Sequence, residues 1–226
     1  MKRAALIVFI VLLIDQFVKI WIKTHMSLGE QISVIENFFY IHFTENNGMA
    51  FGLELEGEYG KLILSLFRIL AVFGIGWYLV ILVKQKAHRG LISSISLIMA
   101  GAIGNILDSA FYGLIFDKGT TSQGEYYSDI AQFSSNGYAS FLHGSVVDMF
   151  YFNTHLEHVF WKSGPFNFSF PIFNISDSAI TIGVFIILIF QRRFFKHEKK
   201  EEVQITDSPG STDEKENSSS SESENL

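Results

Sequence analysis

Residues 91–116 read LISSISLIMAGAIGNILDSAFYGLIF, and this stretch decides the fold. An α-helix needs about 20 mostly apolar residues to cross a hydrocarbon core roughly 30 Å thick, and this run is long enough. It also contains Asp108, although a charge at that depth costs at least about 2.5–3.5 kcal/mol. The stretch therefore predicts a membrane helix that contains a carboxylate. One such residue can be an accident of packing, but Asp15, Asp108, Asp148 and Asp177 are four at one depth, which indicates a site.

Three more apolar runs have the same character, at residues 4–22, 61–83 and 178–195. The whole chain is 48% hydrophobic and 15% aromatic, which is unusual for a soluble domain of 226 residues. The expected fold class is a membrane all-α protein with four transmembrane helices and a small β element.

The charge distribution divides the chain into two parts. Residues 198–226 carry nine acidic and three basic side chains, which account for the net charge of −6. This Ser-rich segment is too polar to bury a core and is predicted to be a disordered cytoplasmic tail. Residues 1–197, the predicted transmembrane domain, are neutral, so no basic surplus indicates a nucleic-acid partner.

The Lys and Arg residues that flank the spans predict the orientation. One side carries four such residues spread over long segments, and the other carries ten in short ones: Lys2, Arg3, Lys84, Lys86, Arg89, Arg192, Arg193, Lys196, Lys199 and Lys200. The side with ten should be cytoplasmic. We therefore expect a multi-pass membrane protein with both termini inside and with the outer loops 23–60 and 117–174 facing outward.

The two outer loops differ in composition. Residues 30–53 are rich in β-branched and aromatic side chains and contain an Asn-Asn-Gly turn, so short strands are expected there, in a small sheet on the outer leaflet. Residues 117–140 are rich in Gly, Ser, Thr and Tyr and are interpreted as an insertion. The insertion is either a tolerated loop or an outer lid or partner surface.

All ionisable residues of the spans lie towards the outer face: Asp15, Lys19, Arg68, Asp108 and Asp177, with Asp148 in the outer segment before the last span. The inner stretches 4–14, 69–83, 91–107 and 178–190 contain none. A transporter or channel needs polar groups through the full depth, so this alternative is disfavoured. A structural membrane scaffold, in which the carboxylates only tie helices together, is the other alternative.

Two aspartates are the best candidates for chemistry. Cysteine and a Gly-x-Ser-x-Gly motif are absent, and the spacing of His155, Glu157 and His158 is not that of a metal site, so no metal or cofactor is expected. Two close carboxylates share one proton, so one can activate water and the other can protonate a carbonyl. Asp148 has apolar neighbours that should raise its pKa, and Asp177 opens a helix. The sequence leaves open which of them holds the proton.

The other polar residues of the spans have structural interpretations too. Asp15 can pair with Lys19 at i,i+4. Asp108 can be held by Asn105 or Arg68. Gly101 and Gly104 are typical of close helix packing in membranes.

Five blocks in this order resemble the lipoprotein signal peptidase family, also called signal peptidase II. They are Asp15-Gln16 with Lys19, Asn46-x-Gly48-x-Ala50-Phe51, Gly101-Ala102-x-Gly104-Asn105-x-x-Asp108, Val146-Val147-Asp148 and Phe173-Asn174-x-x-Asp177-Ser178. Each block is weak alone, but five in order on four spans are specific together.

The resemblance implies an aspartyl endopeptidase of the bacterial inner membrane, without a metal and with its active site toward the periplasmic side. It would cut diacylglyceryl-modified prolipoproteins just before the lipidated cysteine, in contact with membrane lipid, and we expect it to act as a monomer. Asp148 and Asp177 match the catalytic pair, and the outer strands match a cradle beside the membrane. The positions that match substrate-binding or supporting residues are Asn46, Gly48, Asn105, Asp108, Asn174, Asp15 and Lys19.

The chain departs from the family pattern in three places. Ser109 follows Asp108 where the family usually has arginine, and Arg68 is a candidate substitute. The separation between Asp108 and Asp148 is longer than usual, which is why residues 117–140 are interpreted as an insertion. The acidic tail is extra and is expected to be dispensable.

Overall fold

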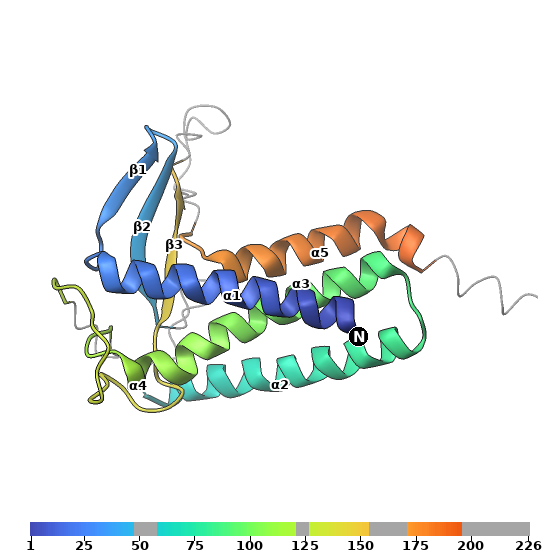
Figure 1. Cartoon of the computed structure of the whole chain (residues 1–226), viewed down its shortest axis with the longest axis horizontal. Coiled ribbons are helices and arrows are strands. Elements are labelled where there is room, and N and C mark those ends of the chain that lie inside the picture. The colour runs from blue at the N-terminus through green and yellow to red at the C-terminus, as the bar shows by residue number, and fades with distance from the viewer. Residues whose placement is uncertain (48–57, 121–126, 154–170, 196–226) are drawn as a thin grey trace, which may run out of the picture. The chain divides into compact units, whose positions relative to one another are not determined.

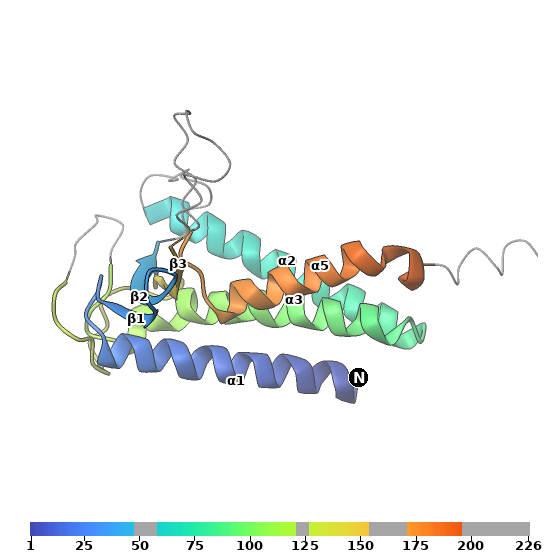
Figure 2. The ribbon, with the colours of Figure 1, turned by 90° about the horizontal axis from the view of Figure 1, so that it is seen from above.

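A computed structural model describes residues 1–47, 58–120, 127–153 and 171–195, and the helices and the sheet belong to one compact unit, Met1–Phe194. Four long helices lie along one direction, and a small sheet stands at one end of them (Figures 1 and 2). The helical elements are α1 (Lys2–His25), α2 (Glu58–Lys84), α3 (Arg89–Leu107), the π-helical turn η1 (Asp108–Tyr112), α4 (Gly113–Ile115) and α5 (Ile175–Phe194). The strands are β1 (Gln31–Ile35), β2 (Phe39–Asn46) and β3 (Val146–Phe152).

Four helices are long and apolar enough to cross a membrane, as the sequence predicts. They comprise Lys2–His25, Leu62–Lys84, Arg89–Ile115 and Ile175–Phe194. Large apolar side chains such as Phe9, Phe73 and Ile189 point away from the protein. An exposed apolar surface of this extent is stable in lipid and not in water.

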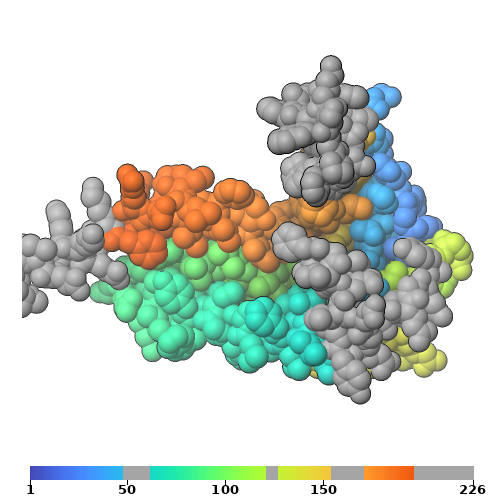
Figure 3. Space-filling model, turned by 180° about the vertical axis from the view of Figure 1, so that it is seen from behind, coloured from blue at the N-terminus to red at the C-terminus, as the bar shows by residue number. Residues whose placement is uncertain are grey.

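α3 is the central helix and contacts α1, α2 and α5. On the side of the molecule away from α1, α3 lies between α2 and α5 (Figure 3). The contact with α5 depends on glycine, as the sequence predicts. A Cβ added at Gly101 would lie 2.1 Å from the Ser176 carbonyl oxygen, and one at Gly104 would lie 2.0 Å from Ser176 Oγ. Larger residues would separate the two helices at the level of the polar cluster described below.

The sheet is antiparallel in the order β1-β2-β3. β1 and β2 form the hairpin that residues 30–53 predict, with Asn37 in the left-handed region in its turn (φ 59°). β3 comes from the other outer loop, and its register places Asp148 opposite Thr44 and Val146 opposite Asn46. Asn46 is therefore a diagonal neighbour of Asp148, within side-chain reach.

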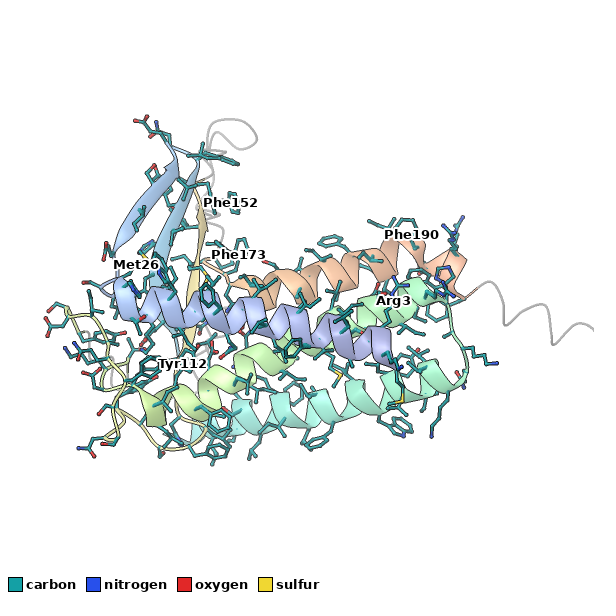
Figure 4. All side chains as sticks on the ribbon, in the orientation of Figure 1. Arg3, Met26, Tyr112, Phe152, Phe173 and Phe190 are labelled. Carbon is teal, nitrogen blue, oxygen red and sulfur yellow. The ribbon has the colours of Figure 1, made fainter. Side chains whose placement is uncertain are left out.

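A hydrophobic cluster joins the sheet to the ends of α1 and α3. It is formed by Ile22, Met26, Phe43, Tyr112, Phe116, Ala131, Val147 and Met149. Met26 at the end of α1 and Tyr112 of η1 lie at the sheet end of the helices, whereas Arg3 and Phe190 lie at the opposite end (Figure 4). The cluster fixes β3 against the helices, because alternate residues of the strand are buried in it.

The described parts of residues 117–140 pack closely against this end of the molecule. Buried Lys23 of α1 forms an ion pair with Glu45 of β2, and its ammonium lies 5.2–5.4 Å from the ring centroids of Phe116, Tyr127 and Tyr138. The Tyr127 hydroxyl donates to Glu45 at 2.8 Å. The segment is thus anchored to both a helix and the sheet; whether it is an insertion relative to the family stays a prediction.

Candidate active site

The site begins with the way α5 starts. Asn174 precedes the helix, and its side-chain oxygen accepts from the backbone N–H of Asp177 at 2.9 Å. In return, Asp177 Oδ2 accepts from the backbone N–H of Asn174 at 3.2 Å. This reciprocal pair is a capping box, and it fixes the side chains of both residues at the positive end of the helix dipole.

The residue before the cap is paired with β3. The Phe173 N–H donates to the Phe150 carbonyl at 3.1 Å, and the Phe150 N–H donates back at 2.8 Å. The rings of Phe173 and Phe152 stack with their centroids 5.9 Å apart, and both residues lie where β3 adjoins the start of α5 (Figure 4). This short bridge brings the start of α5 beside the strand that carries Asp148.

Asn174 connects the two aspartates. Its Nδ2 donates to Asp148 Oδ1 at 2.6 Å while its backbone N–H binds Asp177. Asp148 is 3% exposed, and Asn46 of β2 also donates a hydrogen bond to it. The two carboxylates therefore share one hydrogen-bonded network that is held by β2, β3 and α5.

Asn105 of α3 closes this network from below. Its Nδ2 donates to Asp177 Oδ1 at 2.8 Å. Its Oδ1 accepts from Asn174 Nδ2 at 3.1 Å and from Lys19 Nζ at 2.9 Å. Because both ends of this amide are occupied by fixed partners, the Asp177 carboxylate is oriented rather than free to rotate.

A buried ion cluster of Lys19, Asp15 and Asp108 adjoins Asn105. Lys19 Nζ lies 3.1 Å from Asp15 and 2.8 Å from Asp108, and all three side chains are fully buried. Gln16 Nε2 donates to both carboxylates, at 3.1 and 2.8 Å. Asp108 is thus held by Lys19, whereas the sequence predicts Asn105 or Arg68 as its partner.

Each carboxylate of this cluster also binds the backbone of an element that carries a catalytic candidate. Asp15 accepts from the Ser176 N–H of α5 at 2.8 Å, and Asp108 accepts from the Val147 N–H of β3 at 3.3 Å. Asp15 and Asp108 therefore position the neighbours of Asp177 and Asp148 from α1 and η1.

The electrostatics of Asp148 suit an acid that works near neutral pH. Burial, together with repulsion from Asp177, raises the pKa of Asp148 to about 7. Attraction to Lys19 and hydrogen bonds from Asn174 and Asn46 oppose this shift and only partly offset it. Near neutral pH, a carboxyl group in this state is protonated often enough to donate a proton.

The structure brings together eight of the nine predicted site residues: Asp15, Lys19, Asn46, Asn105, Asp108, Asp148, Asn174 and Asp177. The ninth, Gly48, lies outside the described residues, as do Ala50, Phe51, His155, Glu157 and His158. Within the described ranges, no group of three or more His, Asp or Glu side chains is arranged to hold a metal ion.

Gln16 is a member of the site whose role the sequence analysis missed. It bridges Asp15 and Asp108, and its carbonyl accepts from the Tyr112 hydroxyl at 3.3 Å. A polar amide beside two charged residues in an apolar span was the available signal, since such a group needs partners within the protein.

Comparison with known proteins identifies the family. Residues 7–193 match the model of the family described as signal peptidase (SPase) II. The chain belongs to this family. Its members are aspartic peptidases, so this protein is one as well.

Named relatives agree with this assignment, and two solved membrane-enzyme structures are similar to the chain. The chain is 46% identical to a lipoprotein signal peptidase of Porphyromonas gingivalis, over 83% of this chain and 82% of the relative. It is 33% identical to that of Amoebophilus asiaticus, over 89% and 84%. A bacterial membrane enzyme structure solved by the in meso method matches with a TM-score of 0.55 at 29% identity, over 84% of this chain and 92% of that chain. Another matches with a TM-score of 0.54 at 26% identity, over 93% and 96%.

Proposed function

We propose that this protein removes the signal peptide from diacylglyceryl-modified prolipoproteins by cutting just before the lipidated cysteine, with Asp148 and Asp177 as the catalytic pair. One observation carries the proposal. Two aspartates from β3 and α5 meet on the same asparagine, Asn174, at the sheet end of four membrane-spanning helices. Membership of the signal peptidase II family supplies the reaction class.

The reaction needs only these two carboxyl groups and water. The ionised aspartate takes a proton from water, whose oxygen attacks the scissile carbonyl carbon, while the neutral aspartate donates its proton to the carbonyl oxygen. When the tetrahedral intermediate collapses, the C–N bond breaks and the leaving nitrogen receives a proton from the pair. Each cycle consumes one water and restores the single shared proton.

The polar residues around the pair serve orientation. Asn105 and Asn174 hold the two carboxylates, and Asn46 contacts Asp148 from β2. Lys19, Asp15 and Asp108 fix the elements beneath. Gly48 follows β2 in the chain, and we assign it to the substrate side by the match of its motif alone.

The depth of the pair suits a lipid-anchored substrate. We infer from the distribution of Lys and Arg that the sheet end of the helices faces the periplasm and that both termini are cytoplasmic. The acyl chains of the substrate then remain in the outer leaflet while its peptide bond meets the pair. Because the bilayer confines the substrate to two dimensions, it aids orientation before catalysis.

The remaining features complete the proposal. We expect the enzyme to act as a monomer in contact with lipid. Residues 1–197 form the peptidase domain. Residues 198–226 form a cytoplasmic tail that cleavage does not require.

The test compares two forms of one substrate. Purified protein in detergent is incubated with a prolipoprotein that carries diacylglycerol on its lipobox cysteine, and with the same prolipoprotein lacking the lipid. We expect release of the signal peptide from the first only, with the modified cysteine as the new N-terminus by mass spectrometry. Equal cleavage of both forms, or cleavage of neither, contradicts the proposed substrate.

A further inference from the structure

A second buried ion pair lies beside the proposed site. Lys23 of α1 and Glu45 of β2 form it, and both side chains are fully buried. Glu45 directly precedes Asn46, and its partner in β3 is Val147, the neighbour of Asp148. A buried ion pair is often no more stabilising than well-packed apolar residues of the same volume. Its place at the end of β2 therefore indicates a role in geometry.

The carboxylate of Glu45 joins three parts of the chain. Oε1 accepts from the Lys23 ammonium of α1 and from the Tyr127 hydroxyl, the latter at 2.8 Å. Oε2 accepts from the Thr120 backbone N–H at 2.6 Å. Because Thr120 and Tyr127 belong to the segment 117–140, this carboxylate ties both that segment and α1 to β2.

The same segment also holds the start of β3. The Thr120 hydroxyl donates to Asn47 Oδ1 at 3.0 Å, and the Ser145 hydroxyl donates to the Thr120 carbonyl oxygen at 2.7 Å. The Ser145 N–H donates to the Tyr138 hydroxyl oxygen at 2.9 Å. Asn47 directly follows β2, and Ser145 directly precedes β3. Hydrogen bonds from one segment therefore hold these two strand ends side by side.

Asn46 lies inside this network. The network holds its neighbours on both sides, Glu45 and Asn47. Asn46 is itself a diagonal neighbour of Asp148 and donates a hydrogen bond to it. The register of β2 on β3 shifts just before the Thr44–Asp148 pair, and such an irregularity disrupts the backbone ladder locally. The side-chain network therefore complements the ladder where Asn46 meets Asp148.

We propose that Glu45 is a positioning residue of the catalytic pair, which holds Asn46 against Asp148 by fastening the end of β2 to α1 and to the segment 117–140. This inference rests on the proposed function. The segment then supports the site and is neither a tolerated loop nor a lid. Glu45 takes no part in proton transfer and acts through Asn46.

The experiment removes the buried pair without leaving a charge unpaired. Lys23→Met with Glu45→Leu keeps the bulk of both side chains and removes one charge of each sign, so this buried-pair variant should fold with a melting temperature close to that of the wild type. Lys118→Met with Asp129→Leu is the matched control, because it makes the corresponding replacements in a more exposed ion pair of the same segment. The measurement is kcat against pH for the full chain in detergent with the diacylglyceryl-modified substrate.

The buried-pair variant should lose about 10²-fold in kcat, because Asn46 no longer holds Asp148 in place. Its alkaline limb should move to higher pH by about half a unit, since a carboxylate that loses a donor ionises less readily. Asp177, Lys19 and Arg68, whose charges also act on this carboxyl group, are unchanged in the variant. The control should keep the wild-type rate and limb. A folded buried-pair variant with the wild-type kcat overturns the proposal.

A double-mutant cycle tests whether Glu45 acts through Asn46. In the Asn46→Ala background, the buried-pair replacement should change kcat by less than about threefold, because the contact that it positions is already lost. Equal losses of kcat in both backgrounds overturn the proposal, since the ion pair would then support the fold and not this contact.

A milder variant serves if the buried-pair variant does not fold. Tyr127→Phe removes one donor to Glu45 and keeps the ring over Lys23. A loss of kcat that disappears in the Asn46→Ala background supports the proposal, and a wild-type kcat overturns it.

Hydrogen–deuterium exchange provides a readout that does not depend on cleavage. The backbone amides of residues 39–46 and 146–152 should exchange at least about tenfold faster in the buried-pair variant than in the wild type or the control, at equal melting temperature. Unchanged exchange overturns the role of Glu45 irrespective of activity. If the wild-type protein does not cleave, the proposed function fails while the exchange still decides this role, so the two failures are distinguishable.

Discussion

Asn174 is the residue on which the site depends most. Its side-chain oxygen caps α5, its backbone N–H binds Asp177 and its amide nitrogen donates to Asp148 and Asn105. Of the common N-cap residues, asparagine combines a capping oxygen with an NH₂ group that can serve the second carboxylate. One side chain therefore both caps α5 and holds Asp148, a member of the proposed catalytic pair.

Substituting this residue should separate the two roles. Asn174→Ser keeps a hydroxyl that can cap the helix but loses the donor to Asp148, so we expect near wild-type thermal stability and about a 10²-fold loss of kcat from misplaced carboxylates. Asn174→Ala should show the same loss of activity and about 1 kcal/mol lower stability in addition. Cleavage at the wild-type rate by Asn174→Ser contradicts this role.

The pH dependence of the wild-type enzyme follows from Asp148. Its pKa is raised to about 7, so the proton that it donates is present below that pH and is lost as pH rises through it. The rate of cleavage should therefore fall on the alkaline side with an apparent pKa near 7, in a profile that belongs to the coupled pair. A rate that stays constant from pH 6 to pH 9 is incompatible with Asp148 as the acid.

At the residue scale, the sequence predicts which charged residues belong to the site better than it predicts which residues they contact. Asp15 with Lys19 follows from helical spacing, and the apolar neighbours of Asp148 account for its raised pKa. The contact of Lys19 with Asp108 joins two helices that are distant in the chain. Spacing along one helix cannot reveal such a contact, because it depends on how the helices cross.

At the scale of elements, the ion cluster of Asp15, Lys19 and Asp108 links α1 to η1, and its backbone bonds extend the link to α5 and β3. A buried cation between two carboxylates is costly to remove, because it leaves uncompensated charge in a medium that cannot solvate it.

Lys19→Met should therefore lower the free energy of unfolding by about 3–5 kcal/mol, measured by thermal unfolding in detergent. The double variant Lys19→Met with Asp108→Asn should recover part of this loss. Lys118→Met is the control, because it breaks an ion pair with the largely exposed Asp129 and should cost under about 1 kcal/mol. Equal losses for the two lysines contradict the importance of the buried cluster.

Two elements were not predicted. One is β3, residues 146–152. Its valines and the aromatic residues after Met149 are typical of a strand, but they did not lead to a predicted strand. The run is short, and it pairs with a hairpin far away in sequence. The π-helical turn at Asp108–Tyr112 has no sequence signature; it widens the end of α3 where Asp108 turns towards Lys19 and β3.

On the scale of the whole molecule, the sheet and the proposed catalytic pair lie at one end of the four spans, and Arg3 and Phe190 lie at the other (Figure 4). The count of spans was predictable because apolar length is a strong signal. The close packing of residues 127–140 on Glu45 and Lys23 was not, because composition alone indicated a loop.

The orientation can be measured directly because the chain contains no cysteine. Glu36→Cys places a thiol in the turn between β1 and β2, and Lys86→Cys places one between α2 and α3. A membrane-impermeant maleimide should label Glu36→Cys in intact spheroplasts and Lys86→Cys only after lysis. The reverse pattern contradicts the proposed orientation.

The most direct test of the central claim is the cleavage of diacylglyceryl-modified prolipoprotein by Asp148→Asn and Asp177→Asn, each shown to be folded by its melting temperature. Asp129→Asn, which changes an exposed carboxylate, is the matched control. We expect the wild type and Asp129→Asn to cleave and both pair variants to lose at least about 10³-fold in rate, since each removes a group that transfers a proton. Cleavage by either folded pair variant at more than a tenth of the wild-type rate contradicts the catalytic pair.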